Sequence, residues 1–336
     1  MSLNKRIIEP SSTVPIENFN VVTYSGSGSS LEVDNGFQAD LIWTKCRNVE
    51  HHWGAFDSTI GVRHYLTLNN STALSEGNGA GNYGVETFGS SSTTFYGNRG
   101  RSNSAYLNGT YVAYFWKAGG STSSNSNGSI TSAVSANAAR GVSVLQYTGN
   151  GNSGSTVGHG LGAAPEMIII KSITNSYEWK VWHTGLSSGN QVLFNTAGQA
   201  SDSSVFTTTT PTSTVFSIGN NVGTNGNNAE YVAYCFRSIT GYVKVGTYTG
   251  NGSYNHAIST GFEPGMVLLK SIGTSGENWS IFDSARGGNI RSYVNAYATE
   301  ESGTEFAFSS TGFVLPKWGS MNQNGVAFIY IAFKIN

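Results

Sequence analysis

Short extended runs of apolar residues, bounded by glycine or proline, dominate the chain. The block at 165–171 has a continuous apolar run at 167–170 and ends in Lys171, and a short run of this kind suits a strand that is covered on both faces. Other runs end in tyrosine and a glycine-rich reversal, where Asn-Gly suits a hairpin turn with positive φ. The pattern predicts an all-β protein with many polar turns.

Four such blocks occur three times in the same order. Each copy opens with a strand that ends in tyrosine, continues with a buried strand that ends in lysine, then a Trp-x-x-aromatic segment, and closes with a last apolar strand. The opening blocks lie at 21–28, 144–151 and 245–252, the second at 39–45, 165–171 and 264–270, the third at 53–58, 179–184 and 279–284, and the last at 111–117, 231–237 and 328–334.

The spacing of the blocks predicts the domain organisation. From Tyr147 to Tyr248 is 101 residues, and from Lys171 to Lys270 is 99. We therefore expect three tandem β-sandwich-like modules of about 95 residues. The predicted divisions are an N-terminal arm at 1–18, module 1 at 19–117, a Ser-, Asn- and Gly-rich flexible linker at 118–141, module 2 at 142–239 and module 3 at 240–336. Only a few residues join modules 2 and 3, so we expect a fixed relation there and a mobile module 1.

These phrases resemble a known group of domains. The segments 144–151, 157–162 and 164–171, together with 282–287 and 108–120, resemble a repeat family of uncharacterised domains found in tail-fibre-like and other virion-associated proteins, mainly of marine phages. The copies also differ, because His183 stands where the others have Asp57 and Asp283, and only module 3 has Arg286 just after the acid. A site built from that Asp and Arg is therefore not common to all three modules.

Charge and cysteine content narrow the function further. Charged residues make up 11% of the chain and the formal net charge is -1, which argues against nucleic-acid binding because that requires a basic surface. No apolar run is long enough to span a bilayer, and the N-terminus has no apolar signal region. We expect the chain to stay where it is made, in the host cytoplasm and then the virion. Cys46 and Cys235 are expected to be free, buried thiols.

Catalytic chemistry is poorly supported. No nucleophile elbow or His-x-x-x-His pair is present, and His51-His52 is interpreted as a loop pair rather than a metal site. Acids are few: Asp57 and Asp283 end strands, where Asp commonly caps a turn, and the Glu300-Glu301 pair is expected to be solvated. The sequence predicts no enzymatic activity, no cofactor and no metal.

Binding residues have two interpretations. Trp53, Trp179 and Trp279 occupy one position in all three copies, so they are either sugar-stacking platforms repeated for avidity or core residues between sheets, and the core interpretation is favoured. The loops that differ between copies, at 74–94, 201–211 and 291–305, are the better candidates. Their possible ligand-binding residues include Tyr83, Tyr293 and Tyr297.

The resemblance implies a phage virion structural protein, a tail appendage used for assembly and host-surface attachment. A capsid decoration or head-fibre protein, a glycan-binding lectin and a polysaccharide depolymerase remain as alternatives. The implied partners are other virion proteins, reached through the N-terminal arm, and a host-surface glycan. A homo-oligomer is expected, a trimer by analogy with phage appendages, without membrane insertion.

Overall fold

The computed structural model describes residues 18–76, 84–97, 100–104, 108–197, 199–202, 204–274, 276–317 and 319–335. Residues 1–17 of the predicted arm at 1–18 and Tyr83 lie outside this set. The prediction of an all-β fold is confirmed: antiparallel sheets account for almost all regular structure, and the described residues contain one short helix, α1 (Val222–Asn225).

Each module contains a main sheet in which six strands follow one order. In module 1 the order is β1 (Phe19–Ser25), β9 (Thr110–Trp116), β3 (Leu41–Cys46), β4 (Gly54–Asp57), β5 (His64–Thr67) and β6 (Ser75–Glu76). In module 2 it is β12 (Val142–Thr148), β19 (Glu230–Phe236), β14 (Met167–Ser172), β15 (Lys180–His183), β16 (Asn190–Leu193) and β17 (Gln199–Ser201). In module 3 it is β20 (Val243–Thr249), β28 (Ala327–Phe333), β22 (Met266–Ser271), β23 (Ser280–Asp283), β24 (Ile290–Tyr293) and β25 (Glu301–Ser302).

A smaller sheet covers the outer face of each main sheet. The small sheets are β2 (Leu31–Asp34), β8 (Ser92–Tyr96) and β7 (Gly84–Phe88) in module 1, β13 (Ser155–Gly158) and β18 (Val215–Ile218) in module 2, and β21 (His256–Ser259), β27 (Gly312–Leu315) and β26 (Ala307–Ser309) in module 3. An apolar core fills each sandwich, for example Ile42, Phe56 and Phe95 in module 1. The architecture is therefore sandwich-like.

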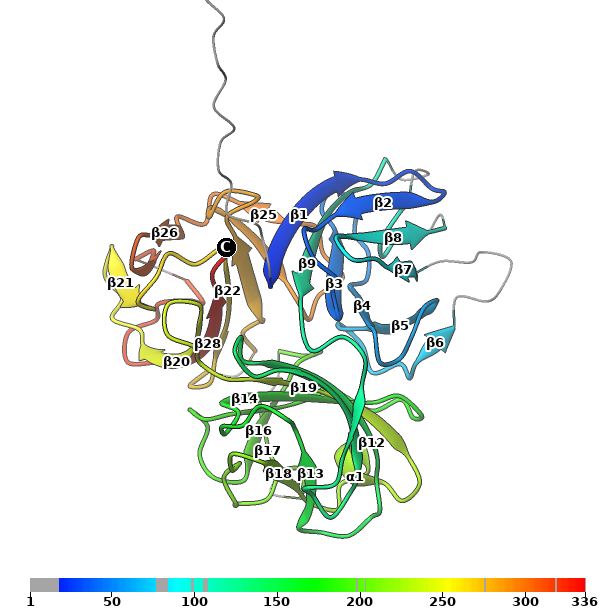
Figure 1. Ribbon diagram of the computed structural model, residues 1–336. Coiled ribbons are helices and arrows are strands. Elements are labelled where there is room, and N and C mark those ends of the chain that lie inside the picture. Colours follow the sequence, from blue (N-terminus) through cyan, green and yellow to red (C-terminus); the bar gives the residue numbers. More distant parts are fainter. Residues whose placement is uncertain are drawn as a thin grey trace, which may run out of the picture.

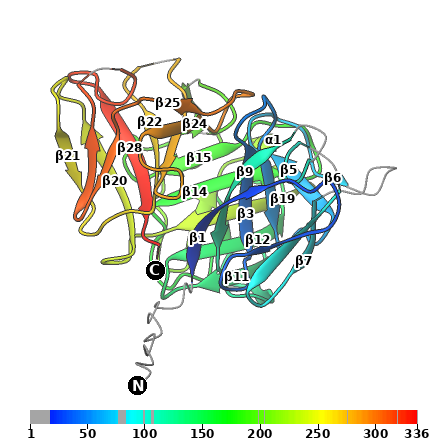
Figure 2. The ribbon, with the colours of Figure 1, turned by 90° about the horizontal axis from the view of Figure 1, so that it is seen from above.

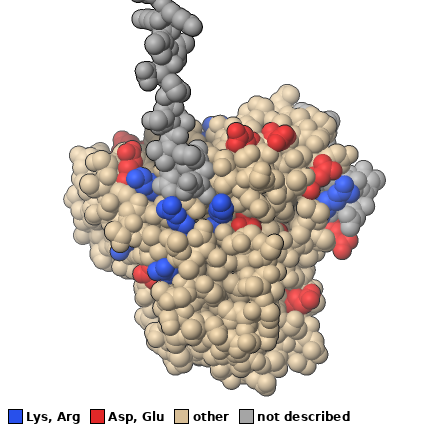
Figure 3. Space-filling model, viewed as in Figure 1, with Lys and Arg blue, Asp and Glu red and all other residues tan. Residues whose placement is uncertain are grey.

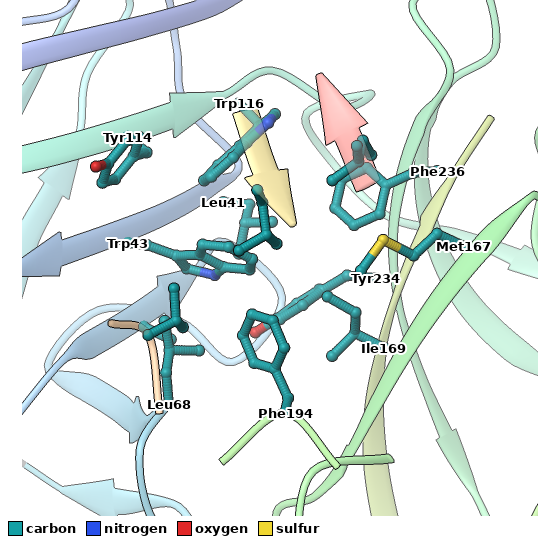
Figure 4. Close-up of a cluster of buried hydrophobic side chains, with 14 of the residues drawn as sticks. Leu41, Trp43, Leu68, Tyr114, Trp116, Met167, Ile169, Phe194, Tyr234 and Phe236 are labelled. Carbon is teal, nitrogen blue, oxygen red and sulfur yellow. The ribbon is translucent and has the colours of Figure 1, made fainter. Parts of the chain in front are cut away.

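The inner faces of the three main sheets form one further core that belongs to all three modules. Three lobes surround a common centre in Figure 1, and the side chains that meet there include Trp43, Trp116, Met167 and Phe236 (Figure 4). The ring centroid of Phe333 is 5.8 Å from those of both Trp116 and Phe236, which occupy the same position in their own modules. Since burying one large apolar side chain contributes about 1.5–3 kcal/mol, this shared core is a major source of stability.

The double burial explains the continuous apolar runs. In β3, β14 and β22 alternate side chains enter the sandwich core and the shared core, and all six residues of each strand are buried. A strand with two buried faces cannot show the alternation of apolar and polar residues that marks a half-exposed strand. The prediction that these strands are covered on both faces is confirmed.

The segment 118–141 is not the flexible linker that its composition predicted. It contains β10 (Ser123–Asn125) and β11 (Ser132–Asn137), and β11 pairs with β12 along six residues. A ladder of backbone hydrogen bonds does not require apolar side chains, and Ile130 and Val134 supply enough of them to reach the core of module 2. Module 1 also packs into the shared core, so the expectation that it moves relative to the others was wrong. In Figure 2 module 3 lies beside module 1, and the strands of module 2 lie behind those of module 1.

A polar corner is repeated at the end of the first strand of each module. The hydroxyls of Tyr24, Tyr147 and Tyr248 donate to the backbone oxygens of Ser102, Thr224 and Met321. The next residue in each case is a buried asparagine, Asn103, Asn225 or Asn322, whose Oδ1 accepts from a backbone N–H of the glycine-rich turn. These contacts fix the three turns.

Each main sheet also buries one lysine against the shared interior. Lys45, Lys171 and Lys270 are fully buried, and each ammonium donates to the carbonyl oxygen of the following residue at 2.8–2.9 Å. Lys171 also donates to the oxygen of Ser71 in module 1 at 3.1 Å. Burial lowers the pKa of Lys171 to about 7 and those of Lys45 and Lys270 to about 8.

This burial predicts a rise in stability with pH. The unfolded chain keeps the Lys171 proton up to its ordinary pKa of 10.5, whereas the folded chain loses it near 7. The unfolded state therefore binds more protons between these values, and the free energy of unfolding should increase by up to about 1.4 kcal/mol per pH unit for one lysine. Urea denaturation between about pH 7 and 8.5 measures the slope, which Lys171→Met should reduce. An unchanged slope in the variant would refute this assignment.

Candidate functional site

The three repeated tryptophans are interior residues. Trp53, Trp179 and Trp279 are each 0% exposed, so their rings have no face available for stacking on a sugar from solvent. The stacking-platform interpretation is therefore contradicted, and the core interpretation agrees with the observed burial.

The same tryptophans join the modules in a closed cycle. The indole N–H of Trp53 in module 1 donates to the oxygen of Tyr293 in module 3 at 2.9 Å. Trp279 of module 3 donates to Leu193 of module 2 at 2.8 Å, and Trp179 of module 2 donates to Thr67 of module 1 at 2.9 Å. We call these three hydrogen bonds the tryptophan cycle. In each module the accepting oxygen lies in the strand after the tryptophan segment, namely β5, β16 or β24. The hydrogen bonds therefore run in one direction around the three modules, from module 1 to 3, from 3 to 2 and from 2 to 1.

A second repeated contact crosses two of the three interfaces. The hydroxyl of Tyr234 in module 2 donates to Asp57 of module 1, and that of Tyr114 in module 1 donates to Asp283 of module 3, both at 2.8 Å. The other oxygen of each carboxylate caps the turn that follows its strand, as predicted for these acids. The carboxylates therefore act both within a module and between modules.

The third interface explains why module 2 has His183 at this position. The residue that aligns with Tyr114 and Tyr234 in the sheet of module 3 is Ile331, which has no hydroxyl to donate. His183 caps its turn through Nδ1, which accepts from the N–H of Gly185 at 2.9 Å, and its Nε2 faces the carbonyl oxygen of Tyr330 in module 3. Burial lowers the pKa of His183 to about 4. A carbonyl oxygen needs a hydrogen-bond donor, which the neutral imidazole provides through its Nε2–H and a carboxylate does not.

The interface between modules 3 and 1 carries a buried ion network. The guanidinium of Arg286 donates to Asp283 at 2.7 Å, to the hydroxyl of Tyr114 at 2.9 Å and to Glu300 at 3.2 Å, and its side chain is fully buried. Glu300 also accepts two hydrogen bonds from Arg47 of module 1. Burial by itself would lower the pKa of Arg286, but Tyr114, Asp283 and Glu300 raise it overall.

This network was only partly predictable. The prediction that Glu300 is solvated was wrong: although burial alone would raise its pKa, Arg47 and Arg286 hold its carboxylate and keep that pKa below the ordinary value. The two arginines lie far apart in sequence, and no local pattern links them. The one sequence feature that pointed to this network is the Asp-x-x-Arg spacing of Asp283 and Arg286, which modules 1 and 2 lack.

The variable loops contain the remaining predicted residues. Tyr297 is 47% exposed, and its ring contacts those of His51 and His52 across the interface between modules 3 and 1. Tyr293 is half-buried, with the Arg291 guanidinium 4.5 Å from its ring centroid. The two tyrosines lie in the same segment of module 3, at 291–305, but have different neighbours, so they do not form one site. Within the described ranges, no group of three or more His, Cys, Asp or Glu residues could hold a metal ion.

A hollow with a mixed polar lining lies at the outer corner of module 3. A pocket of about 500 Å³ opens between the first turn of the module and the segment before β28. Its lining includes Asn251, Glu277, Lys317, Ser320, Gln323 and Asn324. On the face shown in Figure 3 the lower lobe is largely uncharged, and most charged side chains lie on the upper lobes. We name this pocket the module 3 corner.

Both cysteines are buried and free, as expected. Across the part of the chain that the structure describes, no helix combines the length and apolar character needed to cross a membrane.

Replacement of Trp279 tests the tryptophan cycle. Trp279→Phe removes the hydrogen bond to Leu193 and leaves that partly buried carbonyl without this donor, so we expect a loss of about 1 kcal/mol in the free energy of unfolding beyond the loss of ring volume. Trp43→Phe is the matched control, because the indole nitrogen of Trp43 is buried without a hydrogen-bond partner among the described residues. Equal losses in the two variants, measured by urea denaturation, would show that the cycle adds no stability.

Removal of Arg286 tests the ion network. Arg286→Met leaves the buried Asp283 without its cation, so we expect a loss of about 3–5 kcal/mol in the free energy of unfolding. Arg291→Met removes a more exposed pair with Glu301 and should cost at most about 1 kcal/mol. Chemical denaturation of both variants makes the comparison, and similar small losses would refute a structural role for the network.

Comparison with known proteins adds one assignment. A search of curated proteins finds no match. The sequence matches the family described as "Domain of unknown function (DUF7483)" over residues 14–336. This match covers all three modules and the segment between the first two, so the chain belongs to the DUF7483 family.

Proposed function

We propose that the chain is a structural component of a phage particle, a tail appendage that takes part in assembly and in attachment to the host surface. The observation that carries the proposal is the single body formed by the three modules. The shared core and the tryptophan cycle hold the module loops at fixed positions. A rigid scaffold that presents differing loops is suited to recognition.

The chemistry of the chain supports a role without catalysis. The buried acids Asp57 and Asp283 each hold a turn and a tyrosine of another module, so their carboxylates are committed to structure. The virion location rests on the resemblance of the repeated phrases to domains of virion-associated phage proteins. We therefore place attachment ahead of a depolymerase.

Assembly partners form part of the proposal. We infer that the arm at 1–17, which precedes β1, docks onto another virion protein. By analogy with phage appendages we propose a homotrimer. Each of its three chains would contain three modules around one centre (Figure 1). A capsid decoration or head fibre is the second location, and the particle itself distinguishes the two.

Purified particles test the proposal. We expect this chain in their protein content, and in a density map we expect it on the tail with the 291–305 loop facing outward. Deletion of residues 1–17 should remove the chain from particles while the isolated protein keeps its fold. Absence of the full-length chain from purified particles would refute the proposal, and density on the capsid would favour the decoration role.

A further inference from the structure

The module 3 corner combines groups that recognise vicinal hydroxyls. Its lining offers the carboxylate of Glu277 as an acceptor, the ammonium of Lys317 as a donor, and amide groups that both donate and accept. One acid and one cation balance each other there, so the pocket has no strong preference for a charged ligand. A polyhydroxylated neutral molecule matches this mixture of donors and acceptors.

Two aromatic rings are linked to residues that line the pocket. Tyr254 is 59% exposed, and the Lys317 ammonium lies 5.4 Å from the centroid of its ring. Arg291 donates to the hydroxyl of Ser320, another lining residue, and lies over the ring of Tyr293. An exposed aromatic ring beside polar groups offers an apolar face to the C–H side of a sugar while its edge stays hydrated.

The framework of the pocket is fixed before any ligand arrives. Asn322 is fully buried, accepts from the N–H of Asn251, and donates to the carbonyl oxygens of Ser253 and Pro316. The side chain of Asn322 thereby holds both the turn at 251–253 and the segment at Pro316 in place. A preformed site loses less conformational entropy on binding than a mobile loop does.

The corresponding corner of module 2 keeps the framework but has a different surface. Asn225 accepts from Asn150 as Asn322 accepts from Asn251, and Asn227 approaches Gly151 as Asn324 approaches Gly252. The segment of module 2 that precedes this asparagine, at 219–224, contains no charged residue, whereas module 3 has Lys317. Module 2 also places a lysine here, because Cε of Lys180 lies against Gly223. The common framework is structural, whereas Lys317 and Tyr254 of module 3 stand where module 2 has Asn220 and Ser153.

We propose that the module 3 corner binds a neutral hexose or N-acetylhexosamine unit of a surface polysaccharide. Glu277 and Lys317 hold neighbouring hydroxyls, the amides of Gln323 and Asn324 select their orientation, and the ring of Tyr254 contacts the apolar face. The inference deepens the proposed attachment function and rests on it for its biological meaning, but the binding itself belongs to the isolated protein.

Saturation-transfer NMR on the full-length protein tests the site. The probes are the methyl glycosides of glucose, galactose, mannose, rhamnose, N-acetylglucosamine and N-acetylgalactosamine. We expect binding of at least one with a Kd of roughly millimolar, as befits a single small ligand in an open pocket. Glu277→Gln and Asn324→Ala should each weaken that binding by about tenfold, which corresponds to one lost hydrogen bond to ligand.

The matched control is Asn227→Ala at the equivalent corner of module 2, which should leave the affinity unchanged. Thermal unfolding of each variant shows whether the fold is kept, and Tyr254→Ala, at an exposed side chain, provides a second variant with little structural risk. No transfer to any probe, or binding that all three module 3 variants leave intact, overturns the proposal. Sugar binding by a protein that is absent from particles would refute the virion role while the site stands.

Discussion

Each main sheet has a second apolar face, and the need to bury that face determines the rest of the structure. A single module would expose the side of its sheet that carries residues such as Trp43 or Phe236, and an apolar surface of that extent is unfavourable in water. Three sheets placed around one centre cover each other. Apolar contact alone does not fix how the sheets are oriented. The tryptophan cycle fixes their relative orientation, because each indole N–H must meet a carbonyl oxygen of the neighbouring module.

The three interfaces solve one geometric problem with different chemistry. Two of them use a tyrosine and a carboxylate. At the third, module 3 has Ile331 at the tyrosine position, and His183 of module 2 faces a backbone carbonyl instead. The ion network around Arg286 lies where modules 3 and 1 meet, which is the interface between modules that are not consecutive in the chain. Breaking a buried charge pair costs more than breaking an exposed one. The network therefore strengthens closure where no short connection brings the modules together.

Sequence patterns predicted the strands and turns well and the relation between modules poorly. The all-β class and the strands covered on both faces followed from apolar runs such as 167–170, because local periodicity reports burial. The polar composition of 118–141 wrongly predicted a flexible linker, because a polar segment can form a strand through backbone hydrogen bonds. Contacts such as Arg47 with Glu300 join positions 253 residues apart and leave no local trace. The repeated tryptophan was visible as a position, but only the fold shows that its N–H reaches another module.

The resulting division of labour separates scaffold from surface. Equivalent residues of the three modules hold the interior, while the groups suited to a ligand gather at one outer corner of module 3. Differential scanning calorimetry of the full-length chain tests the central claim, that the modules form one cooperative body. The account predicts a single transition in which the calorimetric and van't Hoff enthalpies agree. Two or three separable transitions, one for each module or pair of modules, would contradict it.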